Sequence, residues 1–251
     1  MSSNSAPAVN RQAIILAAGQ GVRLKPDTDN LPKTLLPVSD DDTIIDTIVA
    51  NLAEAGIKDI AIVTGHASEA LVAHAPKLKA RFEVNPVLVD NDRPDWNNAY
   101  SLWCAREYFA DGALVVNGDT LHPVSVEHTI LNTEPKAINL AIDNVKDLTD
   151  EAMKVRLDDQ GAISRITKEM PIEGSFGEFI GISRINANAA PSVTDALAEI
   201  WKNQPNLYYE DAYQLLAADR LLRPAPIGDV EWVEVDDHSD LEKARQLACR
   251  S

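Results

Sequence analysis

The stretch from Ala13 to Val38 reads AIILAAGQGVRLKPDTDNLPKTLLPV. It opens with a short apolar run, Ala13 to Leu16, that is typical of a buried β-strand, and it then changes abruptly into a loop punctuated by glycines. Gly19 and Gly21 can adopt backbone angles that are closed to other residues, so consecutive main-chain N–H groups can turn inward around phosphate oxygens. The stretch therefore predicts a buried strand followed by a phosphate-binding loop.

Three basic residues follow these glycines: Arg23, Lys25 and Lys33. Their side chains can neutralise phosphate charge that the backbone amides leave uncompensated. The spacing is neither the G-x-x-x-x-G-K-[ST] of the Walker A loop nor the G-x-G-x-x-G of dinucleotide-binding proteins. A lone G-x-G would more often be a tight turn beside a solvated lysine. The longer pattern here, in which two glycines are followed by Arg23, Lys25 and Lys33, instead favours a site for a phosphorylated ligand.

Length and composition bound the rest of the chain. With 251 residues, 45% of them hydrophobic, the chain can build one sizeable α/β domain, and two compact domains are the less favoured alternative. Residues 1–10 lack the basic and apolar blocks of a signal peptide and are expected to form a flexible tail. We expect residues 11–251 to form a single domain.

The net charge and the cysteines exclude several classes of protein. A formal charge of −16 argues against nucleic-acid binding, because such proteins present clustered Lys and Arg. An anionic ligand would then need the basic residues named above or a divalent metal. Cys104 and Cys249 are too few for a disulfide framework, and no stretch approaches the ~18 apolar residues of a membrane span. We expect a cytoplasmic protein with neither a nucleic-acid nor a membrane partner.

Hydrophobic periodicity predicts alternating strands and helices in the first half of the chain. Besides the strand in the opening stretch, strands are expected at 58–64, 82–89 and 113–117. Helices are expected at 43–55, 67–75 and 98–109. Asp41 or Asp42 is the expected cap of the first helix. This rhythm implies right-handed parallel crossovers, and hence a doubly wound sheet with helices on both faces.

The alternation of strands and helices ends after residue 120. Strands are expected at 137–143, 153–158, 162–167 and 178–185, joined by short turns. Helices are expected at 192–202 and 210–219, followed by a last strand at 232–235 and a helix at 238–247. The predicted fold class is therefore α/β, with a mostly parallel, Rossmann-like sheet and an antiparallel extension in the second half.

Two acidic positions follow predicted strands. Asp119 comes directly after the strand at 113–117, and Asp236 and Asp237 follow the strand at 232–235. Ligands of open α/β sheets bind at the carboxyl ends of the strands, which favours a binding role for both positions. The structural alternatives are a simple turn at Asp119 and a helix cap at Asp236 or Asp237. Carboxylates at such ends suit Mg²⁺, which prefers hard oxygen ligands.

The string L-A-A-G-x-G-x-R-x-x-P followed by L-P-K-x-L-x-P-V, from Leu16 to Val38, resembles the signature of nucleotidyltransferases that make NDP-sugars and CDP-alcohols. The resemblance implies a nucleotidyltransferase (GT-A-like) architecture with a nucleotide-binding half at 11–120 and an acceptor-binding half at 121–251. It also implies catalytic roles for Arg23, Lys33 and Asp119. It assigns Mg²⁺ to Asp119 and Asp236, with Asp237 as the alternative. The nucleotide-binding residues that it implies are Leu16, Ala17, Ala18, Gly19, Gly21, Arg23, Lys25, Lys33, Gly65, Asn97 and Ser101.

A second string bears on the acceptor. Residues Asn97 to Leu102 read NNAYSL, and N-x-x-[YS]-S-L resembles a loop of cytidylyltransferases that act on phosphocholine, 2-aminoethylphosphonate or inositol phosphate. NDP-sugar enzymes tend to carry P-x-G-[LT]-A there, which this chain lacks. Capping of the following helix explains the string equally well. The acceptor-binding residues implied by the resemblance are Lys168, Glu178, Tyr209 and Glu210. Aromatic rings with carboxylates suit a cationic head group, although core packing or helix-end charges are the structural alternative.

Together these features predict a Mg²⁺-dependent cytidylyltransferase. It is expected to transfer CMP from CTP to a small phosphoalcohol or phosphonate and to release pyrophosphate. Its partners would be CTP and a small anionic acceptor, and a homo-oligomer is left open. The alternatives are an NDP-sugar pyrophosphorylase acting on a sugar 1-phosphate and a non-catalytic nucleotide sensor. The identity of the acceptor is not encoded in any of these strings.

Overall fold

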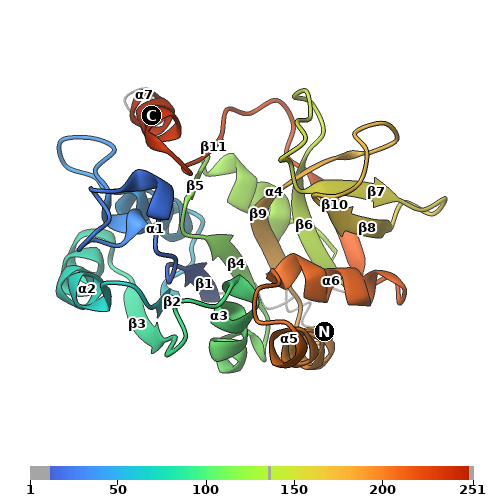
Figure 1. Ribbon diagram of the computed structural model, residues 1–251, viewed down its shortest axis with the longest axis horizontal. Helices are drawn as coiled ribbons and strands as arrows, with labels where there is room; N and C mark the ends of the chain where they lie inside the picture. The colour runs from blue at the N-terminus through green and yellow to red at the C-terminus, as the bar shows by residue number, and fades with distance from the viewer. Residues whose placement is uncertain (1–11, 135–136, 249–251) are drawn as a thin grey trace, which may run out of the picture.

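The computed structural model describes residues 12–134 and 137–248, so the predicted tail at 1–10 and Cys249 lie outside the described residues. The described strands form one large mixed sheet and one small ribbon (Figure 1). The strands of the large sheet are β1 (Gln12–Leu16), β2 (Asp59–Thr64), β3 (Asn85–Asp90), β4 (Ala113–Asn117), β6 (Ile138–Asp143), β7 (Lys154–Leu157), β8 (Ile163–Thr167), β9 (Gly177–Ile185) and β10 (Leu222–Pro226). The ribbon consists of β5 (Thr120–Leu121) and β11 (Val233–Glu234).

The topology confirms the predicted fold class. The large sheet runs in the order β10-β6-β9-β4-β1-β2-β3, with β7 and β8 attached beside β9. The pairs β1–β2, β2–β3, β1–β4 and β6–β10 are parallel. Strand β9 is antiparallel to both β4 and β6, and β7 is antiparallel to β8 and β9. The parallel half is therefore joined to an antiparallel extension, as the succession of strands after residue 120 predicted.

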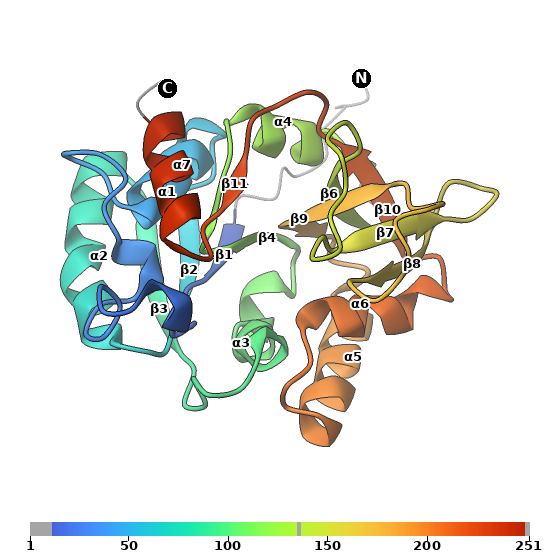
Figure 2. The same cartoon turned by 45° about the horizontal axis from the view of Figure 1, so that its top comes forward.

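Helices cover both faces of this sheet (Figures 1 and 2). They are α1 (Ile44–Glu54), α2 (Ser68–Phe82), α3 (Asn98–Cys104), α4 (Ser125–Leu131), α5 (Ala190–Asn203), α6 (Tyr209–Ala217) and α7 (His238–Ala248), with 3₁₀ turns η1 (Val22–Leu24), η2 (Lys33–Leu35) and η3 (Arg106–Phe109). Alternate residues of β1 enter different hydrophobic clusters: Ile15 packs with α1 and α7 residues, and Ile14 packs with α3, α5 and α6 residues. Within the described residues, no helix combines the length and apolar character needed to cross a bilayer.

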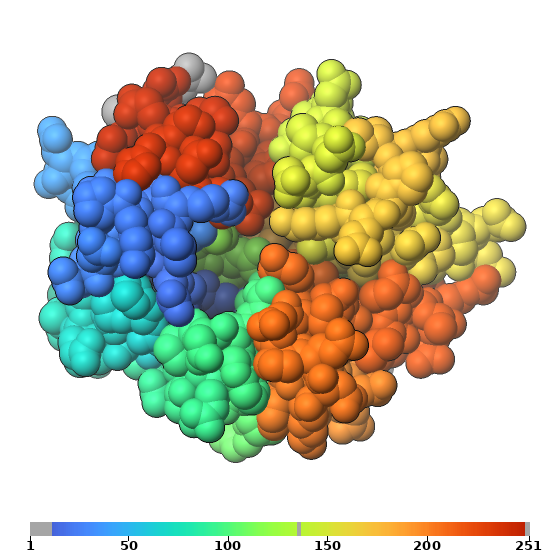
Figure 3. Space-filling view, in the orientation of Figure 1, coloured from blue at the N-terminus to red at the C-terminus, as the bar shows by residue number. Residues whose placement is uncertain are grey.

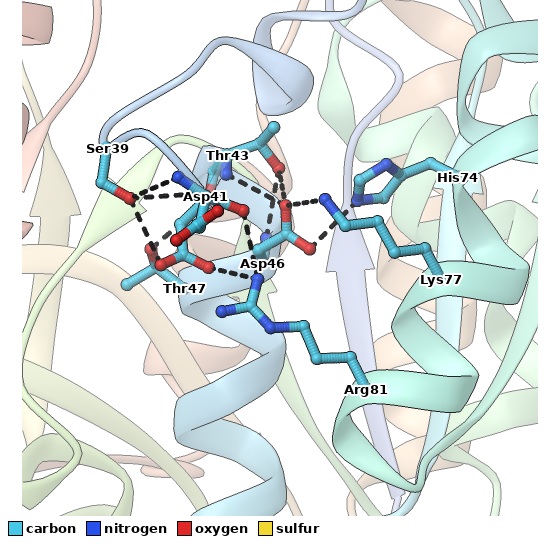
Figure 4. A network of polar contacts seen from close by, with 9 residues as sticks. Ser39, Asp41, Thr43, Asp46, Thr47, His74, Lys77 and Arg81 are labelled. Carbon is cyan, nitrogen blue, oxygen red and sulfur yellow. Dashed lines mark hydrogen bonds and ion pairs between the residues drawn. The ribbon is translucent and has the colours of Figure 1, made fainter.

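The cap predicted for α1 is wrong. Thr43 is the N-cap, and its side chain accepts a hydrogen bond from the Asp46 backbone while the Asp46 carboxylate accepts one from the Thr43 backbone (Figure 4). The same carboxylate lies 3.1 Å from Nε2 of His74 on α2. Asp42 instead forms an ion pair with Arg81, also on α2. The reciprocal capping box satisfies two helix-end donors, which explains why it prevails over an aspartate further out.

Several predicted boundaries were also wrong. Helix α2 continues through Pro76 to Phe82, where the sequence had predicted an end at residue 75 and the start of a strand at 82. Leu78 lies beyond the proline and is fully buried in the core, so tertiary packing outweighs the local cost of proline. The predicted helix at 98–109 divides into α3 and η3. Strands β5 and β10 and helix α4 were not predicted.

Gly118 fixes the connection between β4 and Asp119. A Cβ at this position would lie 2.5 Å from the carbonyl oxygen of Leu16 and 2.8 Å from Cγ2 of Thr34. We expect Gly118→Ala to destabilise the fold by about 1–3 kcal/mol, because the backbone would have to shift. Urea unfolding would measure this cost. A Cβ at Gly19 meets nothing within 4 Å, so Gly19→Ala is the matched control for stability. Equal losses for the two variants would contradict the prediction.

Candidate active site

A cavity of about 250 Å³ opens at the carboxyl ends of β1 and β4. Figure 3 shows the hollow in the middle of this face, between the blue-to-green first half of the chain and the yellow and orange segments of the second half. Open α/β sheets bind their ligands at such strand ends. The lining residues are Leu16, Ala17, Ala18, Gly19, Gly21, Arg23, Lys33, Thr34, Asn97, Asn98, Ser101, Asn117, Gly118, Asp119, Glu151, Met153, Lys168, Glu178, Phe179, Ile180, Gly181, Tyr208, Glu210, Glu234 and Asp236.

The glycine-punctuated loop lines one side of the cavity. Gly21 has a φ of +59°, the left-handed conformation that favours glycine, and Thr28 donates a hydrogen bond to its carbonyl oxygen. Gly65 does not line the cavity but supports the loop from behind, because a Cβ there would lie 3.0 Å from the carbonyl oxygen of Ala18. Lys25 is also outside the lining, and its Nζ lies 3.5 Å from Asp29.

Basic and acidic side chains from distant segments meet on the next wall. Nζ of Lys33 lies 2.7 Å from Oδ2 of Asp119 and 3.4 Å from Oδ1 of Asp236. Arg23 pairs with the other oxygen of Asp236 at 2.7 Å. Burial opposes the charge on Lys33, but the attraction and hydrogen bond to Asp119, aided by Asp236, outweigh it and raise the pKa of Lys33. Lys33 therefore stays cationic at neutral pH.

A carboxylate cluster completes this wall. Oxygens of Asp119, Glu234 and Asp236 lie within 4.8 Å of one another, and Asp119 Oδ1 is buried without a hydrogen-bond partner among the residues that the structure describes. Glu234 is exposed as a residue, but desolvation of its carboxyl, and then the charges of Asp119 and Asp236, raise its pKa. Clustered oxygen donors with an orphaned carboxylate oxygen fit a hard cation such as Mg²⁺. Pairing of β11 with β5 places Glu234 opposite Thr120, which is the residue that follows Asp119 in the sequence.

The structure distinguishes the two neighbouring aspartates. Asp236 faces the cluster, whereas Oδ1 of Asp237 accepts hydrogen bonds from the backbones of Ser239 and Asp240 and so caps α7. Sequence reasoning missed Glu234 as a possible metal ligand. Strand alternation was the available signal, because residues two apart point to the same side of a strand.

Acidic and aromatic side chains from the second half of the chain also line the cavity. Burial raises the pKa of Glu210 to about 8, and its Oε2 is buried with no hydrogen-bond partner in the described part of the chain. Lys168 places Nζ 5.7 Å from the ring centroid of Tyr208. Tyr209, which the resemblance implied as a contact residue, is fully buried outside the lining, and its hydroxyl donates to Asn117. Tyr208 takes its place at the cavity wall.

The loop before α3 caps its helix and also faces the cavity. Oδ1 of Asn97 accepts a hydrogen bond from the Asn98 backbone, which is the capping role, and its Nδ2 donates to the carbonyl oxygen of Asn206. Ser101 is buried and accepts a hydrogen bond from Asn91. Both Asn97 and Ser101 line the cavity, so the cap and a ligand contact are compatible.

Comparison with known proteins gives one family. Residues 12–167 match the family model described as Nucleotidyl transferase. The chain is 28% identical over 251 residues to the CMP-5'-(3-aminopropyl)phosphonate synthase of Streptomyces rubellomurinus, covering 94% of this chain and 38% of that protein. It is 40% identical over 105 residues to the choline-phosphate cytidylyltransferase of Streptococcus pneumoniae, covering 41% of this chain and 43% of the relative.

Sugar-nucleotide enzymes are similar too. The UTP–glucose-1-phosphate uridylyltransferase of Bacillus subtilis is 34% identical over 125 residues, covering 42% of each chain. The chain thus spans about half the length, or less, of these curated relatives. Among solved structures, the inositol-1-phosphate CTP transferase from T. maritima superimposes with a TM-score of 0.81 at 22% identity, covering 96% of both chains. That likeness shows the fold.

Proposed function

The chain belongs to the nucleotidyl transferase family, and on that premise we propose that it is a cytidylyltransferase. It would transfer CMP from CTP to a small phosphoalcohol or phosphonate and release pyrophosphate. The observation that carries this proposal is the meeting of Arg23 and Lys33 with three carboxylates beside a glycine-punctuated loop. Opposite charges around one cavity suit a triphosphate and its divalent counterion.

The proposed reaction needs little proton transfer. A phosphate or phosphonate oxygen of the acceptor is already anionic near neutral pH, so it can attack the α-phosphorus of CTP without a general base. The new P–O bond forms as the bond to the β-phosphate oxygen breaks, and pyrophosphate leaves with that electron pair. Catalysis then rests on alignment and on charge stabilisation. Loop amides and Arg23 would hold the outgoing phosphates, and Lys33 would neutralise charge on the α-phosphate.

Asp119, Glu234 and Asp236 would hold Mg²⁺, which neutralises phosphate charge when it is bound. The present ion pairs occupy these carboxylates with Lys33 and Arg23. Binding of CTP would give the two cations phosphate partners instead. The carboxylates would then be free to act as metal ligands.

The acceptor end of the cavity favours a head group with positive charge. Three glutamates, Glu151, Glu178 and Glu210, and two aromatic residues, Phe179 and Tyr208, line the cavity. Carboxylates and aromatic faces both attract an ammonium group. We therefore propose an amino- or trimethylammonium-bearing phosphoalcohol or phosphonate as the acceptor class.

A substrate matrix tests the proposal. The purified chain would be mixed with Mg²⁺, each of CTP, UTP, GTP, ATP and dTTP, and each of phosphocholine, 2-aminoethylphosphonate, inositol 1-phosphate and glucose 1-phosphate, with pyrophosphate release as the readout. Turnover with CTP and an amine-bearing acceptor is the expected result. A strict requirement for the sugar phosphate would favour an NDP-sugar pyrophosphorylase. Tight CTP binding without any turnover would favour a sensor.

Glu210 should make acceptor binding depend on pH. Its carboxyl, with a pKa raised by burial to about 8, is neutral below that pH and anionic above it. Affinity for an amine-bearing acceptor should therefore rise as the pH increases through about 8. Glu210→Gln should remove this rise. At pH 9, where the wild-type carboxyl is ionised, it should weaken binding about tenfold, because a neutral amide loses the charge-assisted contact. Inhibition constants of 2-aminoethylphosphonate and ethylphosphonate between pH 6 and 9 would measure this. A rise that is equal for the amine-free compound would contradict the prediction.

A further inference from the structure

Lys146 is held between an aromatic ring and a carboxylate. Its Nζ lies 3.5 Å from the ring centroid of Trp232 and 3.0 Å from Oε2 of Glu178. Figure 2 shows the red segment that leads into β11 passing beside the yellow-green loop after β6, which are the segments of Trp232 and Lys146. A carboxylate and a ring face around one ammonium are the groups with which proteins recognise cationic ligands. Here the chain's own lysine occupies such a place.

Asp143, at the end of β6, fixes both partners of this arrangement. Its Oδ1 accepts hydrogen bonds from the backbones of Val145 and Lys146, and its Oδ2 accepts one of 2.7 Å from the Trp232 indole. Burial disfavours the Asp143 carboxylate, but these hydrogen bonds outweigh it and lower its pKa. Asp143 is also the register partner of Glu178 across β6 and β9. The loop that carries Lys146 is therefore tied to the strand that carries Glu178.

Glu178 is approached from two sides. It lines the active-site cavity, whereas Lys146 and Trp232 line a separate surface cavity of about 400 Å³. The Lys146 side chain is 44% exposed and that of Glu178 is 11% exposed. The lysine thus reaches the carboxylate from outside, and an acceptor would reach it from inside. A carboxylate that already faces one cation attracts a second less strongly, because its charge is partly neutralised.

We propose that Lys146 is a specificity-determining residue that limits how strongly the cavity prefers an acceptor with a cationic head group. This inference rests on the proposed function, because it concerns the acceptor end of that site. Trp232 holds the ammonium in place, and Asp143 holds Trp232. Lys146 acts through Glu178 and touches no reacting atom, so it is a positioning residue.

Matched variants and matched probes test this inference. Lys146→Met removes the charge and keeps the apolar stem on Trp232, whereas Lys146→Arg keeps the charge. Isothermal titration calorimetry on the full chain, with Mg²⁺ and α,β-methylene CTP present, would give dissociation constants for 2-aminoethylphosphonate and ethylphosphonate. The ratio of the two constants measures the preference for the amine. A change in overall packing would affect both probes alike and leave this ratio unchanged.

Lys146→Met should raise the preference for the amine about fivefold, the scale of a partly exposed ion pair. Lys146→Arg should restore the wild-type ratio. Glu178→Gln should lower the preference, and adding Lys146→Met to Glu178→Gln should change nothing further. An unchanged ratio in Lys146→Met, additive effects in the double variant, or no binding of the amine probe would overturn the inference.

Wild-type pyrophosphate release separates this result from the proposed function. Suppose the ratio changes as expected but CTP and 2-aminoethylphosphonate give no pyrophosphate. The role of Lys146 in head-group preference would then stand, and cytidylyl transfer to this acceptor would be wrong. Suppose instead that turnover occurs and the ratio is unchanged. The proposed function would then stand without the role of Lys146.

Discussion

Replacing Lys33 by methionine is expected to lower kcat about a hundredfold to a thousandfold, the cost of removing one preorganised group that stabilises developing charge. The Lys33 ammonium is nearly buried, yet Asp119 and Asp236 keep it charged. No water molecule could replace that charge at the α-phosphate. Steady-state pyrophosphate release would measure the loss. Lys79→Met, at an exposed position of α2, is the matched control and should leave kcat unchanged.

The same variant makes a second prediction that is independent of turnover. Without Lys33, the three clustered carboxylates repel one another. The melting temperature of Lys33→Met should therefore fall in metal-free buffer and rise more steeply with MgCl₂ than that of the wild type. Differential scanning calorimetry would compare the two. If Mg²⁺ stabilised both proteins equally, Lys33 would not share its place with a metal ion.

The first half of the fold was predictable because its signals are local. Strand β1 is apolar from Ala13 to Leu16 and is followed by small residues that end in Gly19, and β4 was predicted with its observed ends. Both strands are buried on two faces, which is why they read as continuous hydrophobic segments. The helices between them carry apolar residues at helical spacing, so the parallel crossovers followed from the order of the elements.

The elements that escaped prediction depend on distant contacts. Strand β10 contains Pro224 and Pro226, which argue against a strand, but β10 lies at the end of the sheet path where proline is tolerated. Strand β5 has only two residues and exists because β11 pairs with it. Such a short segment has no period that a sequence pattern could reveal.

For the candidate site too, the residues with a local sequence signal were predictable and those that depend on distant contacts were not. The lining by Leu16 to Gly21 follows from one contiguous string, whereas the cluster at Asp119 needs β11 from the other end of the chain. Tyr208 and Tyr209 are neighbours at the start of α6, and only packing decides which one is buried. Lys146 had no motif at all, because its partners are set by tertiary structure.

Asp119→Asn is expected to reduce kcat about a thousandfold with little change in fold, because the amide has the shape of the carboxylate but lacks its charge. Asp119 faces Lys33 through Oδ2, and its Oδ1 is buried without a hydrogen-bond partner within residues 12–134 and 137–248. The variant would remove one of the oxygens suited to a hard cation and the main counter-charge of Lys33. Mg²⁺ should then be needed at concentrations about tenfold higher or more for half-maximal activity.

Asp237→Asn is the matched control for this variant, because it removes an identical charge one residue beyond Asp236. Its carboxylate caps α7, and asparagine caps a helix about as well as aspartate. Activity and Mg²⁺ dependence should therefore stay near those of the wild type, while Asp236→Asn should resemble Asp119→Asn. A large loss of activity in Asp237→Asn with a mild one in Asp236→Asn would mean that the carboxylates rearrange around the metal. The metal ligand would then have to be reassigned from Asp236 to Asp237.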